Sequence, residues 1–439
     1  MAEIRPFRAL RYDPSRVELE RVLAPVYDVV TPEDRVRFYE KDPHNAIRLE
    51  LTKSVAEEAS TDYSEVARTL AAWRREGVLK LDAKPALYAL RQRFAAPDGR
   101  ALARTGFFCA LKLEDYAKRI VRPHERTLAG PKADRLKILR ASRTNLSAVF
   151  LLYEDPDGKL DALLEQALAA GEPQRARDAG GVAQELIAIE APDAIAEVQR
   201  FLAPRPLVIA DGHHRYETAL AHQAERRAAG AERAGGGEAR SIESDSPADH
   251  IFVYLANAYA AGSLLLPIHR LIVRAPAPSD ARWSELARSG WQQRALAAAS
   301  PEQVEAALRD ALAPHRGAPA FAADDGRGQL RVFWKAAAAE LSAGTAELSI
   351  ETFHREIVVG FFGLDEAAVR GGAVAFPKAI QEAAREVRAG RGTVALYLNP
   401  LRPEDVFRVT AAGATLPQKS TFFYPKLPTG LLFRPLDEA

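Results

Sequence analysis

The sequence predicts an α/β protein, with a mixed α+β arrangement as the alternative. Segments with apolar residues at helical spacing alternate along the chain with short apolar runs that are typical of buried strands. The chain has 439 residues, of which 47% are hydrophobic, which is enough for a substantial core and for two domains. We expect an N-terminal α/β region over 1–229, a flexible loop or linker over 230–248 and a C-terminal α/β region over 249–439.

The first half of the chain is expected to alternate helices and strands after an irregular start. Prolines recur through residues 1–50, and a helix follows over 61–76, where apolar residues repeat at helical spacing up to Gly77. Further along we expect the strands 85–94 and 105–113, a strand-like run over 148–154, and the helices 160–170 and 192–202 around a less regular piece.

The second half begins with a short buried strand over 207–210 and a helix over 215–229. Residues 230–248 are poor in large apolar residues and contain a glycine triplet, which is typical of a flexible segment. Beyond it we expect strands over 251–259, 263–273, 329–335 and 393–399, helices over 278–289, 301–313 and 379–389, and a loop-like tail.

Composition narrows the possible partners. The formal net charge is +1, so no global field draws the chain to nucleic acid or to an anionic membrane, and neither is expected as a partner. The single cysteine, Cys109, excludes an intrachain disulfide and a cysteine-rich zinc site. The sequence has no secretory signal and no apolar run near the roughly 20 residues of a spanning helix. A cytoplasmic location is therefore expected, whereas the oligomeric state stays open.

A five-residue motif, Asp211-Gly212-His213-His214-Arg215, lies where the expected strand 207–210 ends and a helix begins. Gly212 permits a tight turn and a close approach to the backbone. The first N–H groups of a helix lack acceptors within the helix and attract anions, phosphate above all. Arg215 adds a bidentate donor, and the histidines add donors or proton-transfer groups.

A purely structural explanation of this motif is that Asp211 caps the helix, worth about 1 kcal/mol, and that the histidines lie on the surface. Capping accounts for the aspartate and the glycine only. Basic residues in a first turn oppose the helix dipole, so His213, His214 and Arg215 favour an anionic ligand. We therefore predict a phosphate site made by Gly212, His213, His214 and Arg215.

A second polar motif, Arg122-Pro123-His124-Glu125, lies upstream. Phosphoryl transfer to an alcohol needs an acceptor for the hydroxyl proton, and a carboxylate such as that of Glu125 serves this purpose. Asp211 can act as a second carboxylate or as a Mg²⁺ ligand, since Mg²⁺ prefers oxygen ligands. The alternative for His124 and Glu125 is a solvated charged loop.

Two further groups of residues are candidates for binding. Lys132 and Arg135, in Gly-Pro-Lys-Ala-Asp-Arg, lie on one face of a helix that begins after Pro131 and can bind a carboxylate or a second phosphate, although a solvated helix start explains them equally. The tail residues that can close over a nucleotide are Lys419, Ser420, Thr421 and Lys426, and the alternative for this tail is an aromatic strap. No Gly-x-x-x-x-Gly-Lys-Ser/Thr motif occurs, which excludes an ordinary P-loop kinase.

These motifs carry a resemblance to known families. The stretch LVIADGHHRYETAL (207–220) resembles the phosphate-binding strand–turn–helix of the ParB/sulfiredoxin-like superfamily, and its pairing with Pro-His-Glu is similar to the free-serine-kinase branch. Over its full length the chain resembles the large bacterial family DUF1015, through IRPFRALRYDP, APVYDVV, PHERTLAGPKADR, IADGHHRYETAL, LLPIHRLI and PQKSTFFYPKLPTG. The resemblance implies a ParB/sulfiredoxin-like phosphate-binding core followed by a further mixed α/β domain.

The resemblance also implies a function. It points to a nucleotide-dependent phosphotransferase that uses ATP or ADP, with Mg²⁺, on a small hydroxylated metabolite, foremost serine or phosphoserine, in either direction. Glu125 would be the base, while Asp211 and His213 would be its catalytic partners, and His124 would join Lys132 and Arg135 in binding substrate. The alternatives are a nucleotide-binding regulator of ParB type and a phosphoserine phosphatase-type hydrolase. The long spacing from Glu125 to Asp211 leaves open whether the two motifs meet in space.

Overall fold

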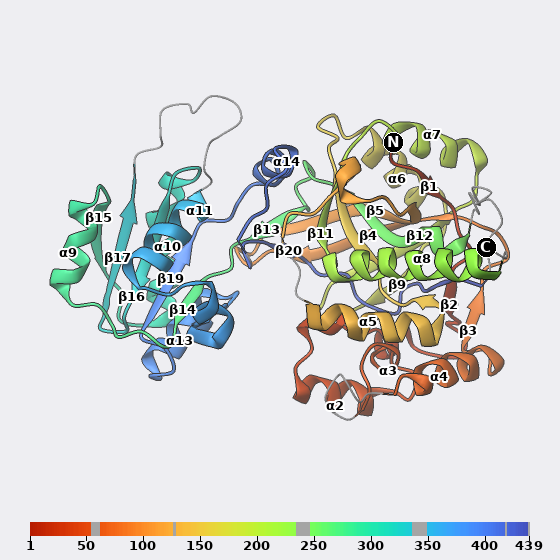
Figure 1. The fold of residues 1–439 in the computed structure, drawn as a ribbon, viewed down its shortest axis with the longest axis horizontal. Helices are drawn as coiled ribbons and strands as arrows, with labels where there is room; N and C mark the ends of the chain where they lie inside the picture. The colour runs from red at the N-terminus through yellow and green to blue at the C-terminus, as the bar shows by residue number, and fades with distance from the viewer. Residues whose placement is uncertain (54–61, 126–128, 234–245, 336–348, 418, 438–439) are drawn as a thin grey trace. The chain divides into compact units, whose positions relative to one another are not determined.

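The computed structural model describes residues 1–53, 62–125, 129–233, 246–335, 349–417 and 419–437. The chain forms two compact units, which are Met1–Leu264 with Pro425–Ala439, and Leu265–Tyr424. Each unit combines helices with a mixed or antiparallel sheet (Figure 1). The predicted α/β class is confirmed.

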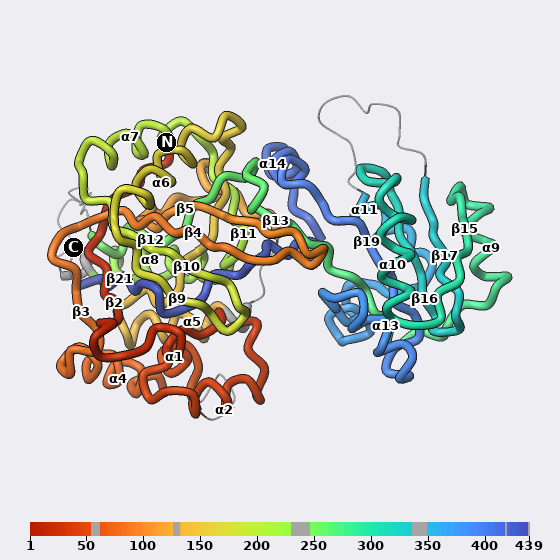
Figure 2. The backbone as a smooth tube through the Cα atoms, turned by 180° about the vertical axis from the view of Figure 1, so that it is seen from behind, coloured from red at the N-terminus to blue at the C-terminus, as the bar shows by residue number. Residues whose placement is uncertain are grey.

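The units divide the chain at a different place from the expected domains. Strand β12 (His250–Asn257) begins just after the expected boundary but lies inside the first unit, hydrogen-bonded to a strand on each side. The tail also returns to the first unit, where β21 (Arg434–Pro435) pairs with β7 (Thr144–Asn145) (Figure 2). Pairings between segments so far apart in sequence leave no trace in local composition. Residues 234–245 of the expected linker lie outside the described residues.

The first unit is built on a nine-stranded mixed sheet in the order β6-β11-β8-β12-β5-β4-β10-β9, with β1 beside β5. Its remaining strands are β1 (Ile4–Arg5), β4 (Leu87–Ala95), β5 (Ala101–Lys112), β6 (Val121–Arg122), β8 (Val149–Tyr153), β9 (Gln174–Arg177), β10 (Ala183–Ile189) and β11 (Leu207–Asp211). Strands β9 and β10 occupy the piece that was expected to be less regular. Strand β10 pairs with β4 on one side and with β9 on the other, and this pairing makes both segments strands.

The helices of the first unit are α1 (Leu19–Val22), α2 (Pro32–Lys41), α3 (Ile47–Glu50), α4 (Ser64–Arg75), α5 (Ala129–Ser142), α6 (Lys159–Ala170), α7 (Pro192–Leu202) and α8 (His213–Arg233). Helix α2 corrects the expectation of an irregular start. Its Pro32 occupies the first turn, where a missing N–H costs nothing, and Thr31 and Asp34 form a capping box before it. Helix α5 runs along α8 (Figure 1).

Two apolar clusters make the core of the first unit. One packs alternate residues of β5, β8, β11 and β12 against α6, α7 and the inner side of α8, where Tyr216 is fully buried. The other joins β2 (Leu10–Tyr12) and β3 (Leu79–Leu81) to the N-terminal helices, and it includes Phe433 from the tail. Alternate residues of a strand point to opposite faces of the sheet, and β8 and β12 are buried along their whole length, so both faces of the sheet are covered there.

The second unit contains a six-stranded sheet in the order β15-β17-β16-β19-β14-β18. The strands of this sheet are β14 (Arg270–Ile272), β15 (Gln292–Ala297), β16 (Ala320–Asp324), β17 (Gln329–Trp334), β18 (Val374–Ala375) and β19 (Val394–Leu398). The second unit also contains β20 (Phe422–Tyr424), which pairs with β13 (Leu264–Leu266) in a separate two-stranded sheet. Its helices include α9 (Asp280–Arg288), α10 (Pro301–Leu312), α11 (Ser349–Phe353), α12 (Glu366–Ala368), α13 (Ile380–Arg388) and α14 (Pro403–Ala411). The single strand expected over 263–273 is divided in two, since Pro267 has no N–H to donate to a ladder.

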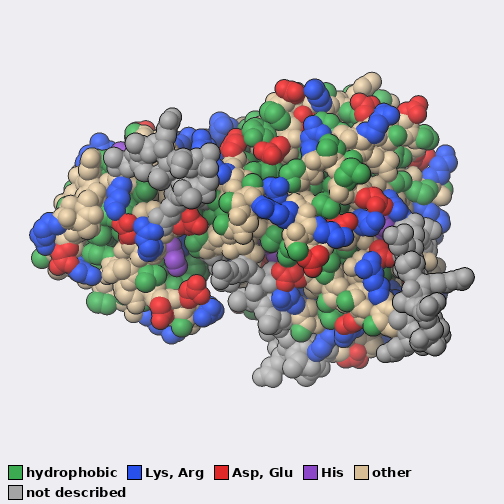
Figure 3. All heavy atoms as spheres, turned by 45° about the horizontal axis from the view of Figure 1, so that its top comes forward, with side chains coloured by type: hydrophobic (Ala, Val, Ile, Leu, Met, Phe, Trp, Pro, Cys, Tyr) green, Lys and Arg blue, Asp and Glu red, His purple; other side chains and the backbone are tan. Residues whose placement is uncertain are grey.

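The described helices include none that is both long and apolar enough to cross a membrane. On the face shown in Figure 3, basic and acidic side chains are interspersed rather than gathered by sign. This pattern agrees with the net charge of +1.

Candidate active site

The two polar motifs meet because β6 and β11 are neighbours in the sheet. They pair in parallel, with Leu207 opposite Val121 and Val208 opposite Arg122. Two parallel strands end at the same edge of a sheet, so His124 and Asp211 follow their strands at that edge. The backbones of the two motifs are therefore adjacent, although the motifs are far apart in sequence.

His124 and His213 form a buried pair between the motifs. The backbone N–H of His124 donates to Nε2 of His213 at 3.3 Å, the ring centroids are 4.7 Å apart, and Nδ1 of His124 donates to the carbonyl of Ile209. The side chain of His124 is 1% exposed, and His213 is 8% exposed. Burial lowers the pKa of both imidazoles, so both are neutral near pH 7.

Gly212 is required at the turn between β11 and α8. Its φ of 91° lies in the left-handed region, and a Cβ built there would lie 2.9 Å from guanidinium atoms of Arg215. A side chain at this position would therefore displace Arg215. The glycine lets Arg215 fold back over the turn toward Asp211.

Asp211, Arg215 and Lys426 form what we call the Asp211 triad. Oδ2 of Asp211 accepts from Arg215 at 2.7 Å, and Oδ1 accepts from Nζ of Lys426. Burial alone would raise the pKa of the Asp211 carboxyl, but the two cations outweigh it and hold that pKa well below its usual range. Both oxygens of the carboxylate are thus engaged by side chains. Two cations against one carboxylate leave a formal excess of positive charge at the helix start.

The residues present do not fit a Mg²⁺ ion on Asp211. Both carboxylate oxygens already accept from cations, which repel a divalent ion. Within the ranges that the structure describes, no group of three or more His, Cys, Asp or Glu side chains is placed to hold a metal. These contacts argue against Asp211 as a Mg²⁺ ligand, which stays a prediction, and no step below is routed through a metal.

Glu125 stands at the edge of this cluster. Its side chain is 24% exposed, and Oε1 lies 4.0 Å from Nε2 of His124. Because His124 donates through Nδ1, its neutral ring presents Nε2 as an acceptor. Glu125 therefore places a partly exposed carboxylate beside the buried His124, whose pKa is influenced by Lys426 and Asp211 of the triad. This is the arrangement that a hydroxyl donor needs if it is to be deprotonated beside an anion site.

The two candidate binding residues of α5, Lys132 and Arg135, are both engaged. Nζ of Lys132 pairs with Glu217 of α8 at 2.8 Å and remains 35% exposed. Arg135 is 7% exposed, donates to Glu50 at 2.8 Å, pairs with Asp134, and stacks 4.0 Å over the ring of Tyr27. Lys132 keeps access to solvent, whereas Arg135 braces α5 against α3.

Lys419, Ser420 and Thr421 belong to the second compact unit, whereas the other candidate residues belong to the first. Ser420 is 5% exposed, and its hydroxyl donates to the carbonyl of Pro417 at 2.5 Å. That hydroxyl therefore has an internal role. A contact of these three residues with nucleotide stays a prediction.

Two buried charged residues were not found by sequence reasoning. Arg104 of β5 is fully buried, donates to Gln92 and to the carbonyl of Pro425, and lies 4.6 Å over the ring of Phe150. It therefore holds the backbone next to Lys426. Glu50 is 2% exposed and accepts from Arg135. The signal for both was a charge inside an otherwise apolar run.

A family model matches more than half of the chain. The model of the family described as "Protein of unknown function (DUF1015)" matches residues 4–308. The chain belongs to the DUF1015 family. The matched residues of this DUF1015 protein include His124, Glu125 and the whole Asp211–Arg215 motif, but not the tail residue Lys426.

No curated protein matches this DUF1015 member. Among solved structures, a conserved hypothetical protein from Pyrococcus furiosus is similar at 11% identity and a TM-score of 0.33, covering 76% of this chain and 97% of that one. A free serine kinase in complex with AMP has 12% identity and a TM-score of 0.31, covering 74% and 92%. SbnI from Staphylococcus aureus has 11% identity and a TM-score of 0.35, covering 75% and 88%. TM-scores this low carry no argument about what the DUF1015 protein does.

Proposed function

We propose that this DUF1015 protein is a nucleotide-dependent phosphotransferase that acts on a small hydroxylated metabolite, foremost serine or phosphoserine. The observation that carries the proposal is the parallel pairing of β6 with β11, which sets the acceptors His124 and Glu125 beside the Asp211 triad. An alcohol proton acceptor next to a cationic cluster at a helix start is what phosphoryl transfer to an alcohol requires. The two short motifs that resemble free serine kinases support serine as the alcohol.

The proposed reaction assigns a task to each group. In the forward direction the serine hydroxyl oxygen attacks the γ-phosphorus of ATP, the bond from that phosphorus to the β–γ bridging oxygen breaks, and ADP leaves. Glu125 takes the hydroxyl proton. Arg215 and Lys426 neutralise charge on the transferred group, and backbone N–H groups of His213 and His214 donate to its oxygens. The reverse reaction takes phosphoserine and ADP to serine and ATP, with Glu125 returning the proton.

Asp211 and the histidine pair position these groups. Asp211 holds Arg215 and Lys426 at one point before the substrate arrives, so little reorganisation is needed at the moment of transfer. His213 and His124 are buried and neutral, so the positive charge at this site comes from Arg215 and Lys426.

The test is phosphorus NMR of the protein with Mg²⁺, ADP and phosphoserine, and then with ATP and serine. We expect phosphoserine to be consumed as ATP appears, and Arg215→Ala to abolish this exchange. Glu125→Gln should lose turnover while it still binds nucleotide, because it removes the proton acceptor and little else. Retained turnover in Glu125→Gln would remove the proposed base.

Other outcomes favour other functions. Free phosphate released from phosphoserine without nucleotide would indicate a hydrolase. Nucleotide binding with no transfer in any mixture would indicate a regulator.

A further inference from the structure

A narrow cavity of about 50 Å³ opens beside Arg215. It lies between α3, α5, the segment 144–147 and α8, and its polar lining is made by Glu50, Arg135, Asn145, Ser147, Arg215 and Thr218. A single water needs roughly 10–15 Å³ by this measure. The cavity therefore has room for a ligand group of a few non-hydrogen atoms.

Two buried polar atoms, on residues that line this cavity, have no hydrogen-bond partner among the described residues. They are Oε1 of Glu50, whose residue is 2% exposed, and Nε of Arg215, whose side chain is 10% exposed. The other atoms of each group are engaged, since Oε2 of Glu50 accepts from Arg135 and NH2 of Arg215 donates to Asp211. An unpaired buried polar group costs about 1–3 kcal/mol, and more when charged. A ligand that brings one donor and one acceptor would satisfy both.

The two sides of the cavity differ in formal charge. Glu50 and Asp134 share the single cation Arg135, which leaves one excess negative charge. The Asp211 triad has two cations and one carboxylate, which leaves one excess positive charge. The complementary ligand therefore carries a cationic donor at one end and an anion at the other.

We infer that Glu50 recognises an ammonium group on the acceptor substrate, through Oε1, while Nε of Arg215 donates to an anionic oxygen of the same molecule. This inference rests on the proposed function, and it makes Glu50 a specificity-determining residue for amine-bearing alcohols and their phosphates. A substrate without the amine leaves a buried carboxylate oxygen unpaired and binds more weakly.

The test compares O-phosphoserine with 3-(phosphonooxy)propanoate, which lacks only the amino group, by isothermal titration calorimetry. The wild-type protein should bind phosphoserine about tenfold or more tighter, the ratio expected for a hydrogen bond to a charged group. In Glu50→Gln the affinity for the desamino compound should be kept and the ratio should fall to about one. If Glu50→Gln does not fold, Glu50→Asp takes its place, because it keeps the carboxylate but shortens the side chain and so moves the charge away from the cavity.

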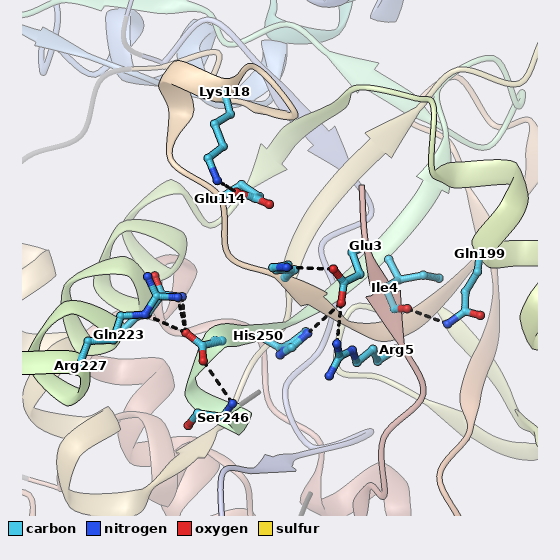
Figure 4. A network of polar contacts seen from close by, with 12 residues as sticks. Glu3, Ile4, Arg5, Glu114, Lys118, Gln199, Gln223, Arg227, Ser246 and His250 are labelled. Carbon is cyan, nitrogen blue, oxygen red and sulfur yellow. Dashed lines mark hydrogen bonds and ion pairs between the residues drawn. The ribbon is translucent and has the colours of Figure 1, made fainter. Parts of the chain in front are cut away.

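The matched control is Asp249→Asn. Gln223 and Arg227, which are labelled in Figure 4, both donate to Asp249. Asp249 is also buried, at 6% exposed, and it does not line this cavity. The control should keep the wild-type ratio.

An unchanged ratio in a folded Glu50 variant overturns the inference, and so does a wild-type protein that binds the two compounds equally or binds neither. The phosphotransferase proposal fails separately. Selective binding without transfer in the phosphorus NMR assay sinks the proposed function and leaves the role of Glu50 standing. Equal transfer to substrates with and without the amino group would support the proposed function and overturn the role of Glu50.

Discussion

Replacing Gly212 by alanine tests the geometry of the Asp211 triad most directly. The left-handed φ of 91° costs an alanine about 1–2 kcal/mol. The new Cβ would also meet the guanidinium of Arg215 at 2.9 Å and displace it from Asp211, at a further cost of about 1.5–3 kcal/mol for a hydrogen bond between charged groups. We expect Gly212→Ala to lose about 2.5–5 kcal/mol in total.

Gly99→Ala separates the two contributions. Gly99 has a φ of 84° in the same unit, and nothing lies within 4 Å of its virtual Cβ, so its substitution carries the backbone cost alone. Hydrogen exchange read by mass spectrometry is the suitable assay, because peptides of β11 and α8 report the opening free energy of the first unit without interference from the second. Gly212→Ala should lower this opening free energy by about 1.5–3 kcal/mol more than Gly99→Ala. Equal losses in the two variants would refute the close approach of Arg215 as the reason for the glycine.

Three further predictions concern Lys426 and His213 in the first unit and the ion pair of Asp324 with Arg388 in the second. Lys426→Met should raise the pKa of Asp211 toward its usual range and weaken ADP binding about tenfold. An NMR titration of the carboxyl carbon measures the pKa, and calorimetry measures the affinity. An unchanged pKa of Asp211 would contradict the prediction. Burial lowers the pKa of His213, so below about pH 6.5 the unfolded chain binds more protons than the folded one, and the free energy of unfolding should fall as the pH drops. Urea denaturation at several pH values measures this dependence, and His213→Gln should make it less steep. An equally steep dependence in the variant would count against the prediction. Asp324 is fully buried and pairs with Arg388 at 2.7 Å, so Asp324→Ala should destabilise the second unit by about 3–5 kcal/mol. Hydrogen exchange of peptides from β16 and β19 measures this loss. A loss under about 1 kcal/mol would argue against a structural ion pair.

The local structure of the phosphate motif could be predicted from the sequence. The strand before Asp211 and the helix after Gly212 occur where apolar run, glycine and helical spacing indicate them. Short-range signals of this kind act within one turn or one strand, so a single sequence carries them. The irregular start was predicted wrongly for the same reason: prolines were given more weight than the capping box of Thr31, which places Pro32 at the one helical position that suits it.

Partners far apart in sequence could not be predicted. Nothing in the local pattern shows that His124 lies against His213, or that Glu50 accepts from Arg135. These contacts exist because the sheet order puts β6 next to β11 and because α3 packs near α5. Backbone hydrogen bonds between strands depend on register and order, to which each side chain contributes little.

The sequence by itself determined that a cluster of basic side chains sits at the start of a helix behind a glycine, since that depends only on residues a few positions apart. Tertiary structure decided what the cluster faces. Arg104 donates a hydrogen bond to the carbonyl of Pro425. The next residue, Lys426, donates to Asp211, from which it is separated by 215 positions in the sequence. The carboxylate that sequence reasoning offered to a metal is occupied by that lysine and by Arg215, because buried charge is stable only when an opposite charge is brought to it, and only the folded chain can bring one.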